Sequence, residues 1–293
     1  MSSKMNKPAI AFFGTSLFST IVLDELKSAD MTPDLIIATP DKPQGRKLVL
    51  TPPPAKVWAE KNNVHIIQPM KLRDGALLEE LKKIRPEGWD IFIVASYGKI
   101  IPKEIIDLPK YKTLNVHPSL LPKLRGASPI QSAILLDEKE TGVTIIRLDD
   151  EMDHGPILAQ EKVTIPNWPP TTNELKHVLG HAGGKMLAAL IPNWIAGTVD
   201  EVPQDHSQAT YTKKIEKSDG LIELADDSYN NFLKIQAFSE WPTAYFFISK
   251  NGARIRVIIK KAEFKDGKLE ILRVVPEGKS EMDYADFARG YLK

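Results

Sequence analysis

Hydrophobic and polar positions along the first part of the chain alternate between short apolar runs and segments of helical period. Strands are predicted for the apolar runs at 9–13, 35–38, 64–67 and 91–95. Helices are predicted for the segments at 20–28, 55–62 and 77–84, where apolar residues recur every three to four positions. Strands and helices alternating at this spacing are typical of βαβ units. We therefore expect an α/β fold with a mostly parallel, Rossmann-like sheet covered by helices on both faces.

The same alternation continues to about residue 196 and then stops. Strands are predicted at 113–117, 142–148 and 157–165, and helices at 127–136 and 171–195. The next segment, 197–209, loses this periodicity and collects polar residues and a proline, which is the composition of a linker. We expect residues 1–196 to form a first, catalytic domain and residues 197–209 to connect it to a second.

The last part of the chain has the pattern of a small β domain. A helix is predicted at 230–238, and strands are predicted at 244–248, 254–259 and 269–275. Asn251-Gly252 and Asp266-Gly267 separate these strands, and such dipeptides are strong hairpin signals. Residues 210–293 are therefore expected to form a small antiparallel β-barrel, OB-like, or a sandwich.

Composition adds limits to this picture. The 293 residues are enough for two domains with separate cores. With 39 Lys and Arg against 38 Asp and Glu, the net charge of +1 gives no global positive field, so any site for a polyanion must be a local patch. The absence of cysteine excludes disulfides, thiolate metal sites and a cysteine nucleophile. No stretch approaches a membrane span or a signal sequence, so we expect a cytoplasmic protein without membrane contact.

Candidate chemistry begins at Asn115 and His117, which end the predicted strand 113–117. In open α/β sheets, ligands bind at the carboxyl ends of the strands. Because side chains alternate along a strand, Asn115 and His117 point to the same side of the sheet. An amide stabilises a developing oxyanion, and an imidazole beside it transfers a proton near neutral pH. A structural role at a strand end is the commoner interpretation of the same two residue types.

A second polar segment, 149–156, follows the predicted strand 142–148. It carries four carboxylates in one tight loop: Asp149, Asp150, Glu151 and Asp153. A carboxylate from this loop would orient the His117 imidazole and stabilise its protonated form. From the spacing alone, an acidic solvated turn is an equally good interpretation.

Two motifs favour the catalytic interpretation of these residues over the structural one, because they resemble motifs of a known family. Asn115 and His117 lie in Asn-Val-His-Pro-Ser-Leu-Leu-Pro, and Asp153 lies in Met-Asp-His-Gly-Pro-Ile-Leu. Both motifs resemble those of the formyltransferases that use 10-formyltetrahydrofolate. The resemblance implies that Asn115, His117 and Asp153 are the catalytic trio, with 10-formyltetrahydrofolate as co-substrate and no metal.

Within that superfamily the chain most resembles the methionyl-tRNA formyltransferase family, from about Ile10 to the C-terminus. Residues 39–56 resemble its inserted loop, which reaches the acceptor end of initiator tRNA, and residues 96–102 resemble its folate-site loop. Residues 124–131 and 237–242 resemble two further family motifs. The resemblance implies formylation of initiator methionyl-tRNA for translation initiation, by a chain that we expect to be a monomer.

The resemblance also implies which residues hold the two substrates. Folate-binding residues are expected in three segments: Tyr97, Gly98, Lys99, Ile100 and Ile101; Ser119, Leu120, Leu121 and Pro122; and Asp149 and Asp150. The tRNA is expected to contact Lys42, Arg46 and Lys47 on the inserted loop and Arg254, Arg256 and Lys260 in the second domain.

Charge gives these tRNA residues a physical basis. Lys42, Arg46, Lys47 and Lys56 place four cations on a proline-stiffened loop, which suits phosphate binding. In 254–260, strand alternation sends Arg254, Arg256 and Lys260 outward and the intervening apolar residues inward. A solvated surface loop and solubilising charge on an ordinary β domain are the alternatives on charge alone.

Some positions of the chain differ from the family motifs, and other functions are compatible with the same trio. His154 stands where Thr is common in the family, Ser128 where Ala is common, and Ser239-Glu240 replaces Asn-Pro, but no catalytic group is lost. A sugar-nucleotide formyltransferase shares the trio and is the nearest alternative. A glycinamide ribonucleotide formyltransferase, a hydrolase that releases formate, and a nucleic-acid-binding protein on an inactive enzyme scaffold are further alternatives.

Overall fold

The computed structural model describes residues 7–45 and 48–292 and divides the chain into two compact units. The first unit contains the chain up to Arg125 together with Gly142–Val163 and His177–Tyr211, and the second contains Gly126–Thr141, Thr164–Lys176 and the chain from Thr212 onward. The functional division expected from the sequence, with boundaries at 196 and 210, stays a prediction. In the part of the chain that the structure describes, no helix is long and apolar enough to cross a membrane.

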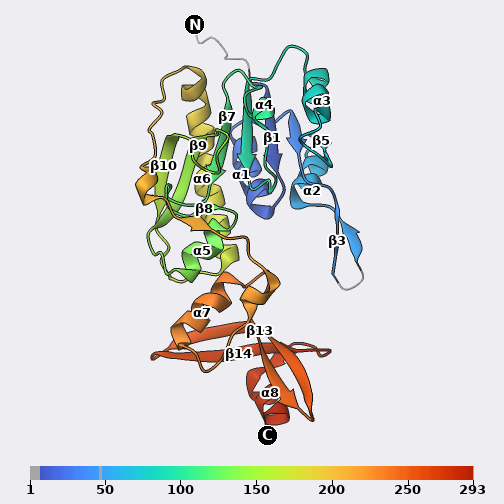
Figure 1. Cartoon of the computed structure of the whole chain (residues 1–293), viewed down its shortest axis with the longest axis vertical. Helices are drawn as coiled ribbons and strands as arrows, with labels where there is room; N and C mark the ends of the chain where they lie inside the picture. The colour runs from blue at the N-terminus through green and yellow to red at the C-terminus, as the bar shows by residue number, and fades with distance from the viewer. Residues whose placement is uncertain (1–6, 46–47, 293) are drawn as a thin grey trace. The chain divides into compact units, whose positions relative to one another are not determined.

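A seven-stranded sheet is the centre of the first unit (Figure 1). In spatial order it consists of β10 (Ile157–Val163), β9 (Thr141–Arg147), β7 (Thr113–His117), β6 (Ile91–Ala95), β1 (Ile10–Gly14), β2 (Leu35–Ile37) and β5 (His65–Ile67). The strands from β7 to β5 pair in parallel, and β9 pairs antiparallel with β7. The central strands are buried along their whole length because helices cover both faces. The predicted mostly parallel sheet is confirmed.

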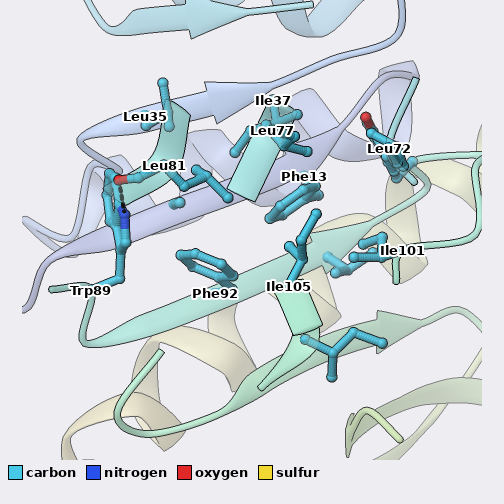
Figure 2. Close-up of a cluster of buried hydrophobic side chains, with 14 of the residues drawn as sticks. Phe13, Leu35, Ile37, Leu72, Leu77, Leu81, Trp89, Phe92, Ile101 and Ile105 are labelled. Carbon is cyan, nitrogen blue, oxygen red and sulfur yellow. Dashed lines mark hydrogen bonds between the residues drawn. The ribbon is translucent and has the colours of Figure 1, made fainter. Parts of the chain in front are cut away.

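One face of this sheet packs against α3 (Ala76–Ile84) and α4 (Lys103–Ile106). The inward residues of β1, β2 and β6 form an apolar cluster with Leu77 and Leu81 of α3 and Ile105 of α4 (Figure 2). Trp89 closes one end of the cluster by donating from its indole N–H to the carbonyl of Leu81 at 3.0 Å. Tyr97 and Ile101 belong to the same cluster, so the folate loop expected from the sequence is anchored in the core.

The other face of the sheet carries α1 (Leu17–Ser28), α2 (Pro54–Lys61) and α6 (Thr172–Ile195). Glycines let α6 approach closely: a Cβ at Gly180 would lie 2.9 Å from Ile21 of α1, and one at Gly183 would lie 2.6 Å from Val116 of β7. This packing presses α6 against the strand that carries Asn115 and His117.

The second unit contains α5 (Pro129–Leu135), α7 (Ser228–Ala237), α8 (Tyr284–Tyr291) and a four-stranded sheet. The sheet is antiparallel, with β12 (Tyr245–Lys250), β13 (Ala253–Lys265), β14 (Lys268–Pro276) and β15 (Met282–Asp283) in that order. Val257, Ile259, Val274 and Phe287 are the centre of its core. The antiparallel sheet and its hairpins are confirmed. Among the described residues the sheet is open, since β12 and β15 are its two ends, so the expected closure into a barrel is not seen.

Several short elements had no sequence prediction. They are the hairpin of β3 (Lys42–Gln44) and β4 (Val49–Thr51), the pair β8 (Arg125–Gly126) and β11 (Tyr211–Thr212), the 3-10 turns at His206–Gln208 and Lys217–Gly220, and α4, β15 and α8. Strands of two or three residues that no helical segment separates along the chain, unlike β2 and β5, carry too little periodicity to stand out from a loop. The segment interpreted as a linker is likewise bound to the sheet edge, because Val202 and Ile157 exchange two backbone hydrogen bonds of 2.8 and 2.9 Å.

Candidate active site

The carboxyl ends of β1, β6 and β7 form the edge of the sheet at which chemistry-bearing residues gather. The chain leaves β1 toward β2 on one side, while β6 leads to β7 on the other, so the strand order reverses between β1 and β6. Thr15 ties these two strand ends together, since its amide donates to the carbonyl of Ser96 at 3.2 Å and its hydroxyl to that of Tyr97 at 3.1 Å. Ligands of open α/β sheets bind at such a point of reversal.

Asn115, His117 and Asp153 meet at this edge. Asn115 and His117 lie two residues apart on β7 and are 8% and 4% exposed, and Asp153 lies in the loop after β9. The Asn115 amide donates to Oδ1 of Asp153 at 3.1 Å, and Nδ1 of His117 lies 3.5 Å from the same oxygen. The structure therefore brings together the three residues that the sequence analysis selected, around one carboxylate oxygen.

The protonation pattern of His117 follows from its second ring nitrogen. Nε2 lies 3.0 Å from the carbonyl of Leu124, and a carbonyl can only accept, so Nε2 carries the hydrogen and donates it. In the neutral ring, Nδ1 is then an unprotonated base that faces Asp153. When Nδ1 takes up a proton, the nearby carboxylate stabilises the resulting imidazolium. The geometry is that of a proton acceptor held in one orientation.

The loop that carries Asp153 has a sharply constrained backbone. Asp153 adopts a left-handed conformation with a φ of 51°, which non-glycine residues adopt infrequently. Gly155 passes so close to β9 that a Cβ there would lie 1.8 Å from the carbonyl oxygen of Arg147. His154 bonds to Oδ2 of Asp149 at 2.8 Å through Nδ1, which is the donor because a carboxylate accepts. His154 thus braces the turn instead of adding a second base beside Asp153.

The segment after His117 is held by its own hydrogen bonds. The Thr144 hydroxyl of β9 donates to the carbonyl of Ser119 at 2.6 Å and accepts from the amide of Leu121 at 3.1 Å. The Gln160 amide of β10 donates to the carbonyl of Leu121 at 2.9 Å. The Leu121–Pro122 peptide bond is cis. The expected folate residues Ser119, Leu120, Leu121 and Pro122 therefore lie on a rigid turn beside the trio.

The other two expected folate segments both adjoin the same apolar cluster. Leu148, at the start of the acidic loop, packs against the cluster that contains Tyr97 and Ile101. The Asp107 carboxylate raises the pKa of Lys103, and the charges of Asp149 and Asp150 act in the same direction. Lys103, which follows the folate loop, therefore lies within electrostatic range of the acidic loop.

Within the folate loop, one polar group is buried and one apolar side chain is exposed. Tyr97 is buried, burial raises its pKa, and its hydroxyl lacks a hydrogen-bond partner within the described residues. The Ile100 side chain is 75% exposed. An exposed aliphatic side chain on a rigid loop offers an apolar surface for a planar ring. The exposed Ile100 side chain and the acceptor oxygens of the acidic loop together suit a folate better than they suit water alone.

A cationic pocket of about 560 Å³ adjoins the folate loop. Three cations line it, Lys71, Arg73 and Lys99, together with one carboxylate, Asp74, and the apolar Leu72 and Ile100. The Lys99 ammonium donates to the carbonyls of Pro69 and Met70 at 2.8 and 3.0 Å, and burial and the charge of Lys42 lower the pKa of Lys99. The pocket is suited to a ligand with carboxylate or phosphate groups.

Of the expected tRNA residues on the inserted loop, Lys42 lies on the hairpin of β3 and β4 and is exposed, whereas Arg46 and Lys47 lie outside the described residues. Lys56 forms an ion pair with Asp41 at 2.8 Å, and hydrogen bonds from Lys56 and Gln68 lower the pKa of Asp41. The Lys56 charge is thus partly neutralised. Lys42 is the described cation that the hairpin presents to solvent.

In the second unit, the predicted alternation along 254–260 is confirmed except at Arg256, which is half-buried. Val257 and Ile259 are buried, and Arg254 and Lys260 are exposed. The Arg254 guanidinium lies 3.8 Å from the ring centre of Phe247, and that of Arg256 lies 3.9 Å from the ring centre of Tyr245. The register of β12 with β13 puts these four side chains on one face of the sheet. Stacking on aromatic rings holds the two guanidinium groups in fixed directions.

Two buried residues of the site had no functional prediction. Gln204 belongs to the segment interpreted as a linker, and Arg125 was noted only as part of a motif. Both side chains are nonetheless buried, with exposed fractions of 5% and 2%, and they are hydrogen-bonded to each other. Gln204 also donates to the carbonyl of Asp153 at 2.9 Å. A charged residue and a glutamine far apart in the sequence give no periodic signal, so only the fold could pair them.

Comparison with known proteins places this geometry in a family. The model of the formyl transferase family matches residues 7–191. A methionyl-tRNA formyltransferase of Geobacillus sp. (strain WCH70) is 35% identical over 303 aligned positions, covering 96% of this chain and 94% of the relative.

Solved structures agree on the fold. A methionyl-tRNA formyltransferase from Clostridium thermocellum superposes with a TM-score of 0.61 at 18% identity, over 94% of this chain and 99% of that one. A sugar N-formyltransferase from Shewanella sp. FDAARGOS_354 gives a TM-score of 0.62 at 16% identity, over 85% and 96% of the two chains. At these identities the two structures support the shared architecture and do not distinguish between acceptors.

Proposed function

The chain belongs to the methionyl-tRNA formyltransferase family, and from that premise we propose that Asn115, His117 and Asp153 catalyse formyl transfer from a formyl-folate to methionyl-tRNA. The donor is 10-formyltetrahydrofolate, and the product is N-formylmethionyl-tRNA, which is used in translation initiation in the cytoplasm. The observation that carries the proposal is the convergence of an amide, an imidazole and a carboxylate on one oxygen at the carboxyl edge of the sheet.

When bound, 10-formyltetrahydrofolate supplies a formyl group whose carbon gains a bond to the methionyl nitrogen and loses its bond to N10. One N–H of the Asn115 side chain is used by Asp153 at 3.1 Å. The other N–H donates to the formyl oxygen as negative charge develops on it. His117, once protonated at Nδ1, is the second stabilising group for this charge.

The attacking amine must lose one proton, and N10 must gain one. Nδ1 of His117, held as an unprotonated base by the bond from Nε2 to Leu124, takes the proton from the amine. Asp153 stabilises the imidazolium at a distance of 3.5 Å until the proton passes to N10. Protons therefore balance without any further acid or base.

The folate is proposed to lie between the folate loop, 97–101, and the acidic loop, 149–153. The exposed Ile100 side chain provides an apolar surface for the rings, and Asp149 and Asp150 provide acceptors for ring N–H groups. The cationic pocket beside Lys99 suits the carboxylates of the glutamyl part. Rigid support of the turn 119–122 by Thr144 and Gln160 keeps the folate rings aligned with the trio.

Initiator methionyl-tRNA is proposed to use two surfaces. The hairpin of β3 and β4 with Lys42, together with Arg46 and Lys47 on the same loop, contacts the acceptor end. Arg254, Arg256 and Lys260 contact the RNA backbone, because stacked guanidinium groups bind phosphate without reading sequence. The enzyme is proposed to act as a monomer, which light scattering on the purified chain would test.

The decisive experiment compares acceptors. The protein is incubated with 10-formyltetrahydrofolate and, in separate reactions, charged initiator methionyl-tRNA, uncharged tRNA and amino-sugar nucleotides, with formate release monitored in each. We expect formyl transfer to charged initiator tRNA alone. Formylation of a sugar nucleotide and not of the tRNA would reassign the protein to the sugar-modifying enzymes, and formate release without an acceptor would make it a hydrolase.

A further inference from the structure

We propose that Gln204 and Arg125 form a positioning unit that holds Asp153 at its working distance from His117. Neither residue is proposed to contact the reacting atoms. Both act through the backbone on either side of the catalytic pair. The inference rests on the proposed function and adds to it two residues that determine the rate without binding either substrate.

Gln204 uses its whole hydrogen-bonding capacity. Its Nε2 donates to the carbonyls of Asp153 and Gly155 at 2.9 and 2.7 Å, and its Oε1 accepts from Nε and Nη2 of Arg125 at 3.2 and 2.6 Å. The amide cannot turn over, because arginine has only donors and would then face the NH₂ group. A buried side chain with both donors and both lone pairs satisfied has one orientation, and that orientation clamps the backbone on both sides of His154.

The position of Gln204 is itself fixed by the sheet. Val202, two residues earlier, pairs with Ile157 at the start of β10 through hydrogen bonds of 2.8 and 2.9 Å. Ile157 lies two residues beyond Gly155. The segment that carries Gln204 is therefore attached to the same strand that leaves the Asp153 loop, and the glutamine spans the gap between them.

Arg125 extends the unit to the other side of the catalytic pair. The residue before it, Leu124, provides the carbonyl that accepts from Nε2 of His117 at 3.0 Å. The backbone of both residues is anchored to Thr210, whose hydroxyl accepts from the amide of Leu124 and whose carbonyl accepts from that of Arg125. Movement of Arg125 would therefore displace the His117 partner and the Gln204 amide together.

The guanidinium has a further fixed contact. Nη2 of Arg125 lies 2.9 Å from Nδ1 of His206, which must be the acceptor because arginine only donates. The neutral ring of His206 stacks on His154 with 4.0 Å between ring centres and 4° between planes. His154 in turn donates to Asp149. The loop from Asp149 to Gly155 is thus braced by side chains at its start, middle and end.

These contacts predict an unusual pair of effects for Gln204→Glu. The carboxylate keeps the volume of glutamine and accepts from Arg125 with a stronger, charge-assisted bond, so the fold is retained. It has no hydrogen to donate to the carbonyls of Asp153 and Gly155, and negative oxygen now faces them. We expect kcat to fall at least tenfold, with less than a threefold change in KM for either substrate and a smaller decrease in Tm than that caused by Gln204→Leu, because the bonds to Arg125 are kept.

Gln204→Leu removes all four hydrogen bonds and is the second variant. We expect a similar loss in kcat with a lower Tm. The control is Asn231→Leu, which removes a buried amide that donates to the carbonyl of Glu223 at 2.9 Å within the second unit. It is expected to lower Tm while leaving kcat within twofold of the unmodified chain. If the kcat of the Gln204→Glu variant is equal to that of the unmodified chain, the positioning role is wrong.

A double-mutant cycle with Asp153→Asn tests whether Gln204 acts through Asp153. Single-turnover rates are compared for the unmodified protein, each single variant and the combined variant. We expect Gln204→Leu to slow the reaction at least tenfold when Asp153 is present and less than threefold when it is replaced. Equal factors in both backgrounds would overturn the inference. Absence of formyl transfer by the unmodified protein would instead reject the proposed function, so the two failures are distinguishable.

Discussion

Replacing Asp153 by asparagine removes one negative charge from the catalytic site and changes almost nothing else. Asparagine has the shape of aspartate, and its oxygen is able to accept the hydrogen bond from Asn115, which is 3.1 Å long in the unmodified protein. The left-handed backbone at this position is also tolerated well by asparagine. The variant should therefore fold normally and lose only the charge that stabilises protonated His117.

The size of the loss follows from the distance. Nδ1 of His117 lies 3.5 Å from Oδ1 of Asp153, and at an effective dielectric constant of about 20 two unit charges at that separation attract by about 5 kcal/mol. The two side chains are only 5% and 13% exposed, so solvent screens the pair weakly. Relaxation of the site recovers part of this energy, which leaves about 3 to 4 kcal/mol, or roughly two to three orders of magnitude in rate.

The measurement is a single-turnover rate at saturating 10-formyltetrahydrofolate and charged initiator tRNA, so that binding does not enter. Glu151→Gln is the matched control, since it removes an exposed carboxylate from the same loop without touching the trio. We expect a fall of about 10² to 10³-fold for Asp153→Asn and a change within twofold for the control. A rate for Asp153→Asn within threefold of the unmodified protein would refute the assignment of Asp153 as the partner of His117.

Three further changes test other parts of the site. Gly155→Ala places a Cβ 1.8 Å from the carbonyl oxygen of Arg147, so the Asp153 loop must shift and kcat should fall about tenfold or more, consistent with the cost of misplaced catalytic groups, as measured by steady-state kinetics. Arg73→Ala removes a cation from the pocket beside the folate loop and should raise KM for 10-formyltetrahydrofolate severalfold with KM for the tRNA unchanged; the opposite pattern would move the folate elsewhere. Arg254→Ala combined with Arg256→Ala removes both stacked guanidinium groups and should reduce the slope of log affinity for tRNA against log salt by about 2, as measured by filter binding, whereas an unchanged slope would exclude them as phosphate contacts.

The fold of the first unit was predictable because its strands are buried on both faces. The apolar run 91–95 was predicted as a strand and is β6 without any shift, and 113–117 is β7. Some short elements were not predictable, although the three-residue strands β2 and β5 were predicted. The hairpin of β3 and β4 has three residues in each strand and exposed apolar side chains at Val49 and Leu50, so its pattern does not identify a buried face.

The candidate site likewise contains residues that the sequence made recognisable and residues that it did not. The two-residue period of a strand and the rule that ligands bind at strand ends made Asn115 and His117 candidates, and the resemblance to the formyltransferases favoured their catalytic interpretation. Asp153 was found by resemblance, because an acidic loop gives no indication of which carboxylate turns inward. The structure supplies that reason: the left-handed conformation at Asp153 and the close approach of Gly155 to β9 direct this one carboxylate toward β7.

Gln204 could not be found from the sequence for a different physical reason. A polar residue in an aperiodic segment is usually solvated, so its type and surroundings favour a linker. Burial changes the interpretation of such a residue, because a buried amide must satisfy its hydrogen bonds and thereby fixes the groups that it contacts. Here the contacts are the two carbonyls that flank His154 and a buried guanidinium. The trio is largely buried and is held by neutral backbone groups, whereas Lys42, Arg254 and Lys260, which are proposed to bind tRNA, are exposed. Catalysis and recognition are therefore expected to respond to different variables, the rate constant to local geometry and the tRNA affinity to ionic strength.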